Sequence, residues 1–569
     1  MPKGPFLNPN GASTSVQSLF QDAVAMHQQG QLVSAQMLYE SVLHKQPRNA
    51  DALHLLGLIA LQVKDYHKAA DSIAKAIKAN PSNAVYYLNQ GIALKELHQF
   101  DAAVASYDRA IALQPHYAAA HYSRGNVLKE LKRLDEAVVS YDKAVALQPH
   151  DVLAHSNRGL ALQELKQLDA ALASFDRAIA IDPSFAEGYL NKSIALRHLQ
   201  RLEDALVSNA AAIALQPHNA LAHSNHGLAL HALNQLDAAV ASFDNAIAID
   251  PSFAEAHFNK SLSLLLGGAF EQGWVEYEWR WKRKESLLTN RQFSQPRWTG
   301  TQSLEGKTVL LYSEQGLGDS LQFCRYAQSV AALGAHVILE VQQPLLGVLQ
   351  GVEGVHHLVA VGSQIPPFDY QCPLLSLPAA FKTNACNMIA ARGYLRANDA
   401  VVAKWSERLG KKMKPRVGIV WSGNAAHSND HNRSLDLERM LAQFPADVEL
   451  VSLQKELREA DASTLESNPH VRHFGADLQD FSDTAALCGL MDVVICVDTS
   501  VAHLSAALGM PTWILLPFNP DWRWLLHGSE SPWYASVKLF RQRHHGDWTS
   551  VFSELRSDLA KLPGVCVGQ

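Results

Sequence analysis

Small and apolar residues recur with a fixed period through the first half of the chain. Seven prolines stand 34 residues apart, namely Pro47, Pro81, Pro115, Pro149, Pro183, Pro217 and Pro251. Glycines keep the same register, at Gly57, Gly91, Gly125, Gly159 and Gly227. A small residue at a fixed place lets two helices approach closely, and a proline ends a helix. The pattern therefore predicts two antiparallel helices in each 34-residue unit.

This register resembles the tetratricopeptide repeat. Counting back from Pro47 and forward from Pro251 gives seven or eight units over residues 16–285, after a flexible polar tail over residues 1–15. We expect the units to stack into an α-solenoid, a superhelix of helix pairs. The recurring aromatic residues are expected to fill the gap to the next unit; they are Tyr107, Tyr141, Phe175 and Phe243.

Asparagines form a second register. They stand two positions before the recurring glycine, or before the serine that replaces it, at Asn89, Asn157, Asn191, Asn225 and Asn259. One interpretation is that their amides satisfy backbone groups between helices. The other is a concave groove whose amides bind a peptide backbone, as a resemblance to repeat-bearing O-GlcNAc transferases implies. The second interpretation predicts a protein or peptide partner in the repeat groove, although repeats alone do not specify a ligand.

The period changes beyond Gly300, where short apolar runs alternate with helical stretches. The runs lie at residues 307–313, 336–341, 357–361, 416–422, 448–453, 492–498 and 511–517. Strands separated by helices predict parallel sheets, here in two Rossmann-like lobes over residues 305–410 and 411–569. Such sheets bind ligands at the carboxyl ends of their strands, so we expect the active site in a cleft between the lobes.

Between the two halves the composition becomes aromatic and basic. Trp274, Tyr277 and Arg280 precede a junction over residues 286–304, which contains Arg297 and Trp298. These residues could form a ligand cage, but bulky side chains at such a place favour an inter-domain seam. The seam predicts that the solenoid is docked onto the second half and not loosely tethered to it.

The first run ends in a glycine-containing turn. Gly316 and Gly318 permit a tight turn that brings the backbone close to a ligand, and Asp319 lies at the opening of a helix expected from Leu321 onward. Asp319 could simply cap that helix. A dinucleotide fingerprint, with Glu340 as its acidic residue, is the rival functional interpretation, but it requires glycine or alanine where Leu321 stands.

A polar loop over residues 421–434 follows a second strand. Arg433 is a fixed cation that could pair with a diphosphate, and Ser422 and Asn424 could supply neutral hydrogen bonds. The alternative for this loop is a solvated surface segment.

The third junction follows the apolar run that ends at Asp498. Thr499 or Ser500 is expected to cap the next helix, whose first turn offers free amide hydrogens and a partial positive charge to a diphosphate. His503 falls in that first turn and could face the same anion; the alternative is a histidine of the core or surface.

Two motifs in order give a second resemblance. The sequence G-L-G-D at 316–319 and D-T-S-x-x-H-L-x-x-A-L-G-x-P at 498–511 are similar to those of family 9 glycosyltransferases, which include the lipopolysaccharide heptosyltransferases. The resemblance covers residues 305–540. It implies a GT-B fold, inverting transfer without a metal or other cofactor, and a nucleotide-sugar co-substrate. It further implies that Asp319 is the base and that Asp498, Thr499, Ser500 and His503 bind the donor.

The chain departs from that family at two positions. Ser500 stands where heptosyltransferases carry glycine, and Arg433 stands where they place a lysine. The segment 519–524, which includes Trp522, Arg523 and Trp524, could wall the nucleotide base together with Arg541, Asp547 and Trp548. For the tryptophans, packing of the C-terminal helix against the lobes is the favoured alternative. A second hypothesis is an inactive scaffold that only assembles partners, but the presence of Asp319, Asp498 and His503 favours an enzyme.

Composition narrows the class of protein. Hydrophobic residues make up 47% of the 569 residues, charged residues make up 18%, and the formal net charge is -6. These values are typical of soluble globular proteins and indicate no nucleic-acid partner. No apolar run is long enough for a transmembrane helix or signal peptide. The six cysteines lack a C-x-x-C pair, so we expect small buried thiols, no metal site and a cytoplasmic location.

Overall fold

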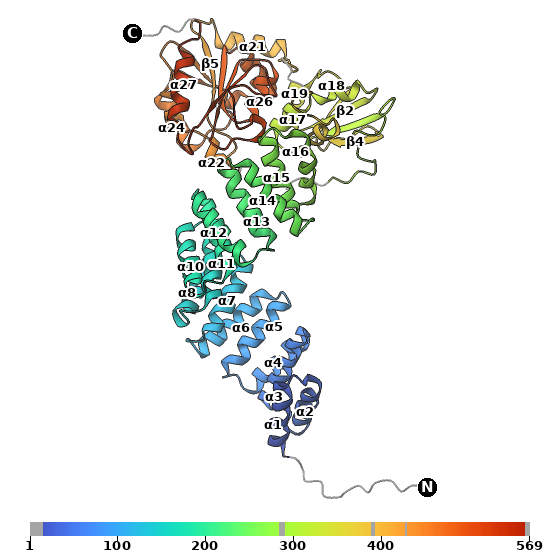
Figure 1. The fold of residues 1–569 in the computed structure, drawn as a ribbon, viewed down its shortest axis with the longest axis vertical. Helices are drawn as coiled ribbons and strands as arrows, with labels where there is room; N and C mark the ends of the chain where they lie inside the picture. The colour runs from blue at the N-terminus through green and yellow to red at the C-terminus, as the bar shows by residue number, and fades with distance from the viewer. Residues whose placement is uncertain (1–14, 284–290, 389–392, 427–428, 564–569) are drawn as a thin grey trace. The chain divides into compact units, whose positions relative to one another are not determined.

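The computed structural model describes residues 15–283, 291–388, 393–426 and 429–563 (Figure 1). It divides into two compact units, Met1–His218 and Asn219–Gln569. The predicted tail lies outside the described residues except for Ser15, whose hydroxyl caps the first helix by accepting from the Ser18 amide at 3.1 Å. The predicted division near residue 285 thus differs from the compact division, which falls within the repeats.

The first unit consists of helix pairs. Its helices are α1 Val16–Gln28, α2 Leu32–Lys45, α3 Ala50–Gln62, α4 Tyr66–Ala79, α5 Ala84–Glu96, α6 Phe100–Leu113, α7 Ala118–Glu130, α8 Leu134–Leu147, α9 Val152–Glu164, α10 Leu168–Ile181, α11 Ala186–His198 and α12 Leu202–Leu215. The second helix of each pair ends two residues before the recurring proline, which confirms the predicted helix ends. Each pair packs on the next, as expected of an α-solenoid.

The recurring glycines allow contact within a pair. A β-carbon added at Gly91 would lie 2.4 Å from Cε1 of Tyr107, and one at Gly159 would lie 2.5 Å from Cε1 of Phe175. These contacts within a pair were not predicted from the sequence. Each ring lies against the glycine of its own pair, because a side chain at the glycine position would overlap the ring.

The turn inside each pair uses a left-handed residue. Positive φ angles recur every 34 residues, at Gly30, Lys64, His98, Lys132, Lys166, Gln200, Asn234 and Gly268. Six of these eight residues are not glycine, so the sequence pattern gave no sign of the turn conformation.

The second unit begins with two further helix pairs. They are α13 Ala220–Ala232, α14 Leu236–Ile249, α15 Ala254–Leu266 and α16 Phe270–Tyr277, followed by the 3-10 helix η1 Glu278–Lys282. Helices α1–α16 make eight pairs in all, which agrees with the seven or eight predicted repeats.

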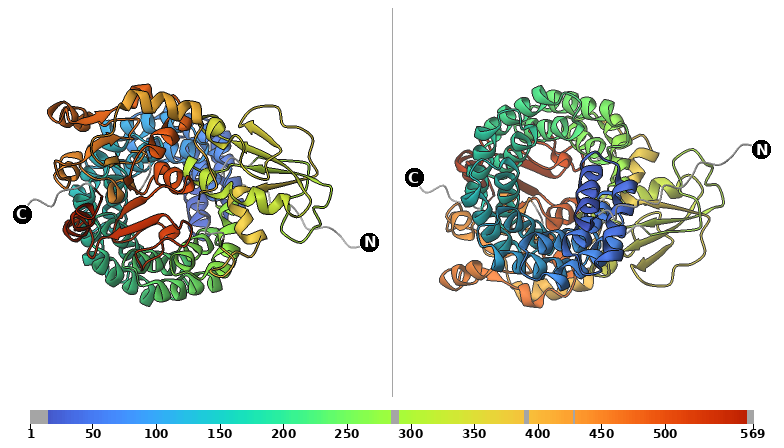
Figure 2. Two further views of the ribbon diagram at one scale, coloured as in Figure 1. Left: turned by 90° about the horizontal axis from the view of Figure 1, so that it is seen from above. Right: turned by 90° about the horizontal axis from the view of Figure 1, so that it is seen from below.

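Two parallel sheets follow the repeats in the second unit (Figures 1 and 2). The first sheet has the order β3-β2-β1-β4 and consists of β1 Thr308–Tyr312, β2 His336–Val341, β3 His357–Ala360 and β4 Tyr370–Pro373. The second sheet has the order β10-β9-β8-β5-β6-β7 and consists of β5 Arg416–Val420, β6 Glu449–Ser452, β7 Val471–His473, β8 Val493–Val497, β9 Thr512–Leu516 and β10 Val537–Arg541. All seven predicted strands are present, and every pairing of these strands is parallel.

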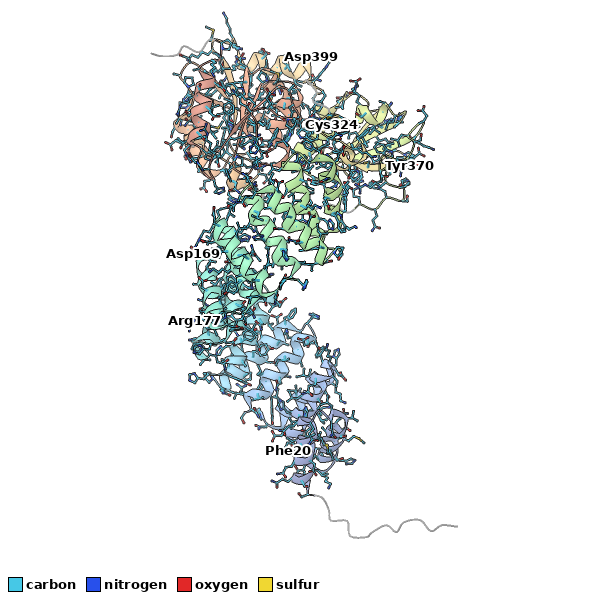
Figure 3. The ribbon with its side chains drawn as sticks, viewed as in Figure 1. Phe20, Asp169, Arg177, Cys324, Tyr370 and Asp399 are labelled. Carbon is cyan, nitrogen blue, oxygen red and sulfur yellow. The ribbon has the colours of Figure 1, made fainter. Side chains whose placement is uncertain are left out.

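Helices connect the strands of both sheets. They are α17 Leu317–Phe323, α18 Tyr326–Ala331, η2 Gln343–Leu345, α19 Leu346–Leu349, η3 Leu374–Ser376, α20 Leu377–Ala380, α21 Asp399–Leu409, α22 Asp430–Arg433, α23 Leu437–Leu441, α24 Glu459–Ser467, η4 Gly475–Asp477, α25 Phe481–Gly489, α26 Ser500–Ala507, η5 Trp522–Trp524 and α27 Thr549–Leu559. Figure 3 labels Tyr370 in β4 and Asp399 at the start of α21, the charged helix that separates the two sheets along the chain. In the part of the chain that the structure describes, no helix is both long and apolar enough to cross a membrane.

The thiols are mostly buried, as expected. Cys324, Cys372, Cys488 and Cys496 are buried, whereas Cys386 is exposed, so the expectation of a buried thiol is wrong there. Cys386 lies in an irregular segment after α20, where no sheet or helix covers it. Cys566 lies outside the described residues.

Aromatic residues join the end of the repeats to the sheets. Trp274 of α16 is 1% exposed, and its ring lies 5.1 Å from that of Trp522 and 6.4 Å from that of Phe323. Arg280 is buried between Glu314 and Glu278, and Trp298 is buried against Phe381. These contacts agree with a seam and give no indication of a ligand cage; residues 284–290 of this stretch lie outside the described residues.

Removing the Trp274 ring should destabilise the second unit. We expect Trp274→Ala to lower the free energy of unfolding by about 3–5 kcal/mol, because the ring fills a space that no neighbour can close. Urea unfolding followed by circular dichroism measures the loss. Val275→Ala is the matched control, since Val275 is 68% exposed and its truncation should change stability by less than about 0.5 kcal/mol. Equal midpoints for the two variants would contradict the seam.

Candidate functional site

The predicted first and third junctions meet in the second unit. Helices α17 and α26 begin side by side, and a β-carbon added at Gly318 would lie 2.9 Å from Cδ2 of His503 and 3.6 Å from Cα of Ser500. The helix at the first junction begins earlier than predicted. Gly316 has a φ of -72°, so it needs no left-handed conformation, and Gly318 lies inside a helix that begins at Leu317 instead of Leu321. The missing side chain at Gly318 instead allows the two helices to approach.

Asp319 is held at both of its carboxylate oxygens. Its Oδ2 accepts a hydrogen bond from the Gly316 amide at 2.8 Å, which caps α17 and explains the early helix start. Its Oδ1 pairs with the guanidinium of Arg523. Burial raises the pKa of Asp319 above its ordinary value, and the charge of Arg523 opposes that rise. The side chain stays 16% exposed, so a ligand can still reach it.

Arg523 of η5 links the two sheets, a role that was not predicted from the sequence. Its Nε donates to Oε1 of Gln322 at 2.8 Å, and its Nη1 donates to Oδ1 of Asp521 at 2.8 Å. The guanidinium also lies over the Trp522 ring, 4.1 Å from its centroid. The sequence placed Arg523 in a segment that could wall the nucleotide base, but it did not indicate the ion pair with Asp319.

Asp498 and Arg433 meet at the end of β8. Nη1 of Arg433 donates to the carbonyl oxygen of Asp498 at 2.9 Å, and its Nε lies 3.6 Å from Oδ1 of Asp430. Burial and the neighbouring Asp521 carboxylate raise the pKa of Asp498 to about 6, against the opposing charge of Arg433. The structure therefore brings the predicted second and third junctions together through this arginine.

His503 lies in the core. It is 5% exposed, its Nδ1 hydrogen-bonds the Tyr534 hydroxyl at 2.9 Å, and its ring stacks on Trp524 at 5.2 Å. Burial lowers the pKa of His503 well below its ordinary value, so the imidazole is neutral at pH 7. His503 is thus a core histidine. Its Nε2 lies 4.0 Å from Oδ1 of Asp498. A neutral imidazole could offer a ligand a hydrogen bond through this nitrogen, but no positive charge.

The start of α26 is left without a side-chain cap. Thr499 occupies the N-cap position but its side chain makes no capping hydrogen bond, so neither Thr499 nor Ser500 plays the predicted capping role. The Thr499 hydroxyl oxygen is buried and has no hydrogen-bond partner among the described residues. Since the first amides of a helix have no partner within it, this helix start presents donors suited to an anion.

The side chains of the polar loop over residues 421–434 make contacts other than those predicted. Ser422 is buried and its carbonyl oxygen accepts from Nε2 of Gln454 at 3.2 Å, whereas Asn424 is exposed and its Oδ1 accepts from the Ala426 amide at 2.9 Å. Neither side chain faces the start of α26 through a described contact. Arg458, missed in the sequence, shares the Asp430 carboxylate with Arg433 and donates to Oγ of Ser434 at 3.1 Å.

The recurring asparagines bond to side chains. Nδ2 of Asn89 lies 2.8 Å from Nε2 of His54, and Nδ2 of Asn157 donates to the hydroxyl of Tyr122 at 2.8 Å. The interpretation that they satisfy backbone groups is wrong for these two, because the preceding repeat presents side chains at that place. Nδ2 of Asn191 and of Asn225 is buried without a hydrogen-bond partner in the described residues, and Asn259 is half-buried.

The described residues contain no group of three or more histidine, cysteine, aspartate or glutamate side chains that could hold a metal ion.

Comparisons with known proteins identify the repeats. Tetratricopeptide repeat models match residues 28–84, 88–152 and 152–185, and a TPR repeat model matches residues 227–265. The chain is 27% identical over 323 residues to protein FlbA of Caulobacter vibrioides, a match that covers 52% of this chain. The match covers 53% of FlbA, so the chain spans about half the length of that curated relative.

Solved structures of repeat proteins are also similar. YrrB, described as a TPR protein with an unusual peptide-binding site, is 28% identical, covers 34% of this chain and 100% of its own, and has a TM-score of 0.31. MamA is 27% identical, covers 29% of this chain and 96% of its own, and has a TM-score of 0.28. The repeat models and the 34-residue register of helix pairs lead to one conclusion: the helix pairs between residues 16 and 277 of this chain are tetratricopeptide repeats.

Proposed function

We propose that residues 305–569 form an inverting, metal-independent glycosyltransferase of the GT-B type, and that the repeats bind a protein partner or acceptor. The reaction transfers a sugar from a nucleoside diphosphate to an acceptor hydroxyl. One observation carries the proposal: Gly318, which directly precedes Asp319 in α17, lies against the uncapped start of α26, after the second sheet's β8. A base and an anion site are the two parts that such a displacement needs.

Asp319 is the proposed base. Its carboxylate accepts the proton of the acceptor hydroxyl as the oxygen attacks the anomeric carbon and the bond to the diphosphate breaks. Burial strengthens it as a base by raising its pKa, while the Arg523 contact fixes its orientation.

The start of α26 is the proposed diphosphate site. The first amides of α26 and the Thr499 hydroxyl, which has no hydrogen-bond partner among the described residues, are donors at this helix start. The Arg433 guanidinium, bonded to the carbonyl oxygen of the adjacent Asp498, adds a positive charge. Arg458 adds a second cation, since it and Arg433 share the single carboxylate of Asp430. Donors of this kind stabilise the charge that develops on a departing nucleoside diphosphate.

The repeats supply the proposed partner site. Asn191, in the first unit, keeps a buried amide donor without a partner among the described residues, and a peptide carbonyl group could satisfy it. A protein or peptide is therefore the partner that this surface fits best.

An inactive scaffold is the second candidate. The observation that favours it is the ion pair between Arg523 and Asp319, which occupies one of the two oxygens that would accept a proton. Ligand binding separates the two candidates, because a scaffold needs no nucleotide.

Thermal-shift measurements test the function directly. Screening the full chain against ADP-, GDP-, UDP- and dTDP-sugars should give one nucleotide class that raises Tm by about 2–4 °C, the shift expected at a hundredfold excess over Kd. The matching nucleoside monophosphate serves as control, since it lacks the second phosphate. An unchanged Tm with every donor would favour the scaffold.

Arg433→Ala should weaken binding of the nucleoside diphosphate by about 1–3 kcal/mol, the usual value of a charge-assisted hydrogen bond. Calorimetric titration measures the affinity. Arg439→Ala is the control, because Arg439 is an exposed arginine on the neighbouring helix α23. If both variants bound as the unaltered chain does, the diphosphate site would lie elsewhere.

Asp319→Asn should abolish the base and keep the cap, since asparagine and aspartate cap helices about equally well. Transfer, or slow donor hydrolysis, should fall by roughly 10²- to 10⁴-fold while donor affinity persists. In the unaltered chain, transfer should fall as the pH drops through the raised pKa of Asp319, because a protonated carboxyl accepts no proton.

The control for the lost ion pair is Asp521→Asn, which also removes a carboxylate partner of Arg523 but not the base. Its turnover should stay within a few fold of the unaltered chain. Turnover in a folded Asp319→Asn protein that matched this control would exclude Asp319 as the base.

A further inference from the structure

The segment that carries Arg523 is hydrogen-bonded to a turn of the repeats. Nδ2 of Asn519 donates to the carbonyl oxygen of His231 at 2.9 Å and to Oδ1 of Asn234 at 2.7 Å. Nδ2 of Asn234 donates in return to the carbonyl oxygen of Phe518 at 2.8 Å. These hydrogen bonds join the α13–α14 turn to residues 518–519, immediately before η5.

The repeat fold alone does not require asparagine in that turn. Asn234 has a φ of 60°, and lysine, histidine, glutamine and glycine occupy the corresponding left-handed position of the other pairs. Since these residues all fit the turn, the fold of the repeat does not explain the amide of Asn234. Its two hydrogen bonds to residues 518 and 519 do.

A second set of polar contacts, from the end of the repeats, holds the loop before Asp319. Arg280 of η1 donates through Nη2 to Oε1 of Glu314 at 3.0 Å, and both side chains are buried. The Tyr277 hydroxyl accepts from Nε2 of Gln315 at 3.0 Å. Glu314 and Gln315 directly precede the Gly316–Asp319 turn, so the last repeat also fixes the approach to α17.

The two tied segments meet at the site. One carries Asp319, the other carries Arg523, and the ion pair between these residues joins them. The second segment leaves η5 through Leu525, a non-glycine residue with a φ of 54°. Such a conformation is costly for leucine and persists only when its surroundings hold it.

We propose that the end of the repeat array is a positioning part of the site. Asn234, through Asn519, sets the place of Arg523 relative to Asp319, and Tyr277 sets the loop before Asp319. A partner that binds over α13–α15 would therefore change turnover even when it is not the acceptor. The predicted effect on turnover rests on the proposed function. The predicted coupling, in which the repeats hold residues 518–526 in place, does not.

Hydrogen exchange tests the coupling without any substrate. Asn234→Gly keeps the left-handed turn, since glycine adopts it freely, and deletes the amide. Lys166→Gly makes the same change at the corresponding, exposed position of another pair. We expect amides of residues 519–526 to exchange about tenfold faster in Asn234→Gly only, with β5 unchanged in both variants.

A conservative variant separates the two hydrogen bonds. Asn234→Asp keeps the acceptor for Asn519 and loses the donor to Phe518, so its exchange should lie between that of the glycine variant and that of the unaltered chain. Equal exchange of residues 519–526 in Asn234→Gly and Lys166→Gly would overturn the proposal.

Kinetic measurements test whether the end of the repeat array positions the base. Asn234→Gly and Tyr277→Phe should lower kcat for donor hydrolysis about tenfold and leave the donor KM within twofold, because they move the base and leave the α26 start in place. Faster exchange with unchanged kcat would overturn the positioning role. If the unaltered chain binds no nucleoside diphosphate, the proposed function has failed, and the exchange comparison still decides whether the repeats hold the segment.

Discussion

The burial of the Trp274 ring is the contact on which the second unit depends. This one side chain of α16 lies against Trp522 of η5, Phe323 of α17 and Trp533 before β10, so it touches the helical end and both sheet regions at once. Aromatic rings of this size contribute much of the energy of a core. Because the ring belongs to a repeat and its neighbours belong to the α/β region, the largest core cluster of the second unit is shared by the repeats and both sheets, while a separate cluster packs on the second sheet.

Much of this fold could be predicted from local patterns. The helix pairs follow from the 34-residue register, and seven strands follow from apolar runs that parallel sheets bury on both faces. The three missed strands are short or carry charge: β7 contains Arg472, β10 contains Lys538 and Arg541, and β4 ends at Pro373. The division at residue 218 could not be predicted, since it depends on contacts between residues far apart in the chain.

The candidate site was predictable only where it follows strand ends. Asp319 follows an apolar run of the first sheet, whereas Asp498 and the start of α26 follow an apolar run of the second. Topology therefore places each at the carboxyl edge of its own sheet. Arg523 lies in the short 3-10 helix η5 and pairs with Asp319, 204 residues earlier in the chain, which no local pattern encodes. The neutral state of His503 depends on the Trp524 and Tyr534 rings that bury it, and these are also distant in sequence.

The left-handed turn inside each helix pair has a consequence for how such a chain can change over generations. Lysine, histidine, glutamine, asparagine and glycine all occupy this position, so the repeat tolerates exchange there. Only the turn at Asn234 makes described hydrogen bonds to the α/β region. Whole repeats ahead of residue 219 could therefore be gained or lost, lengthening or shortening the array, while the residues around Asp319 kept their places.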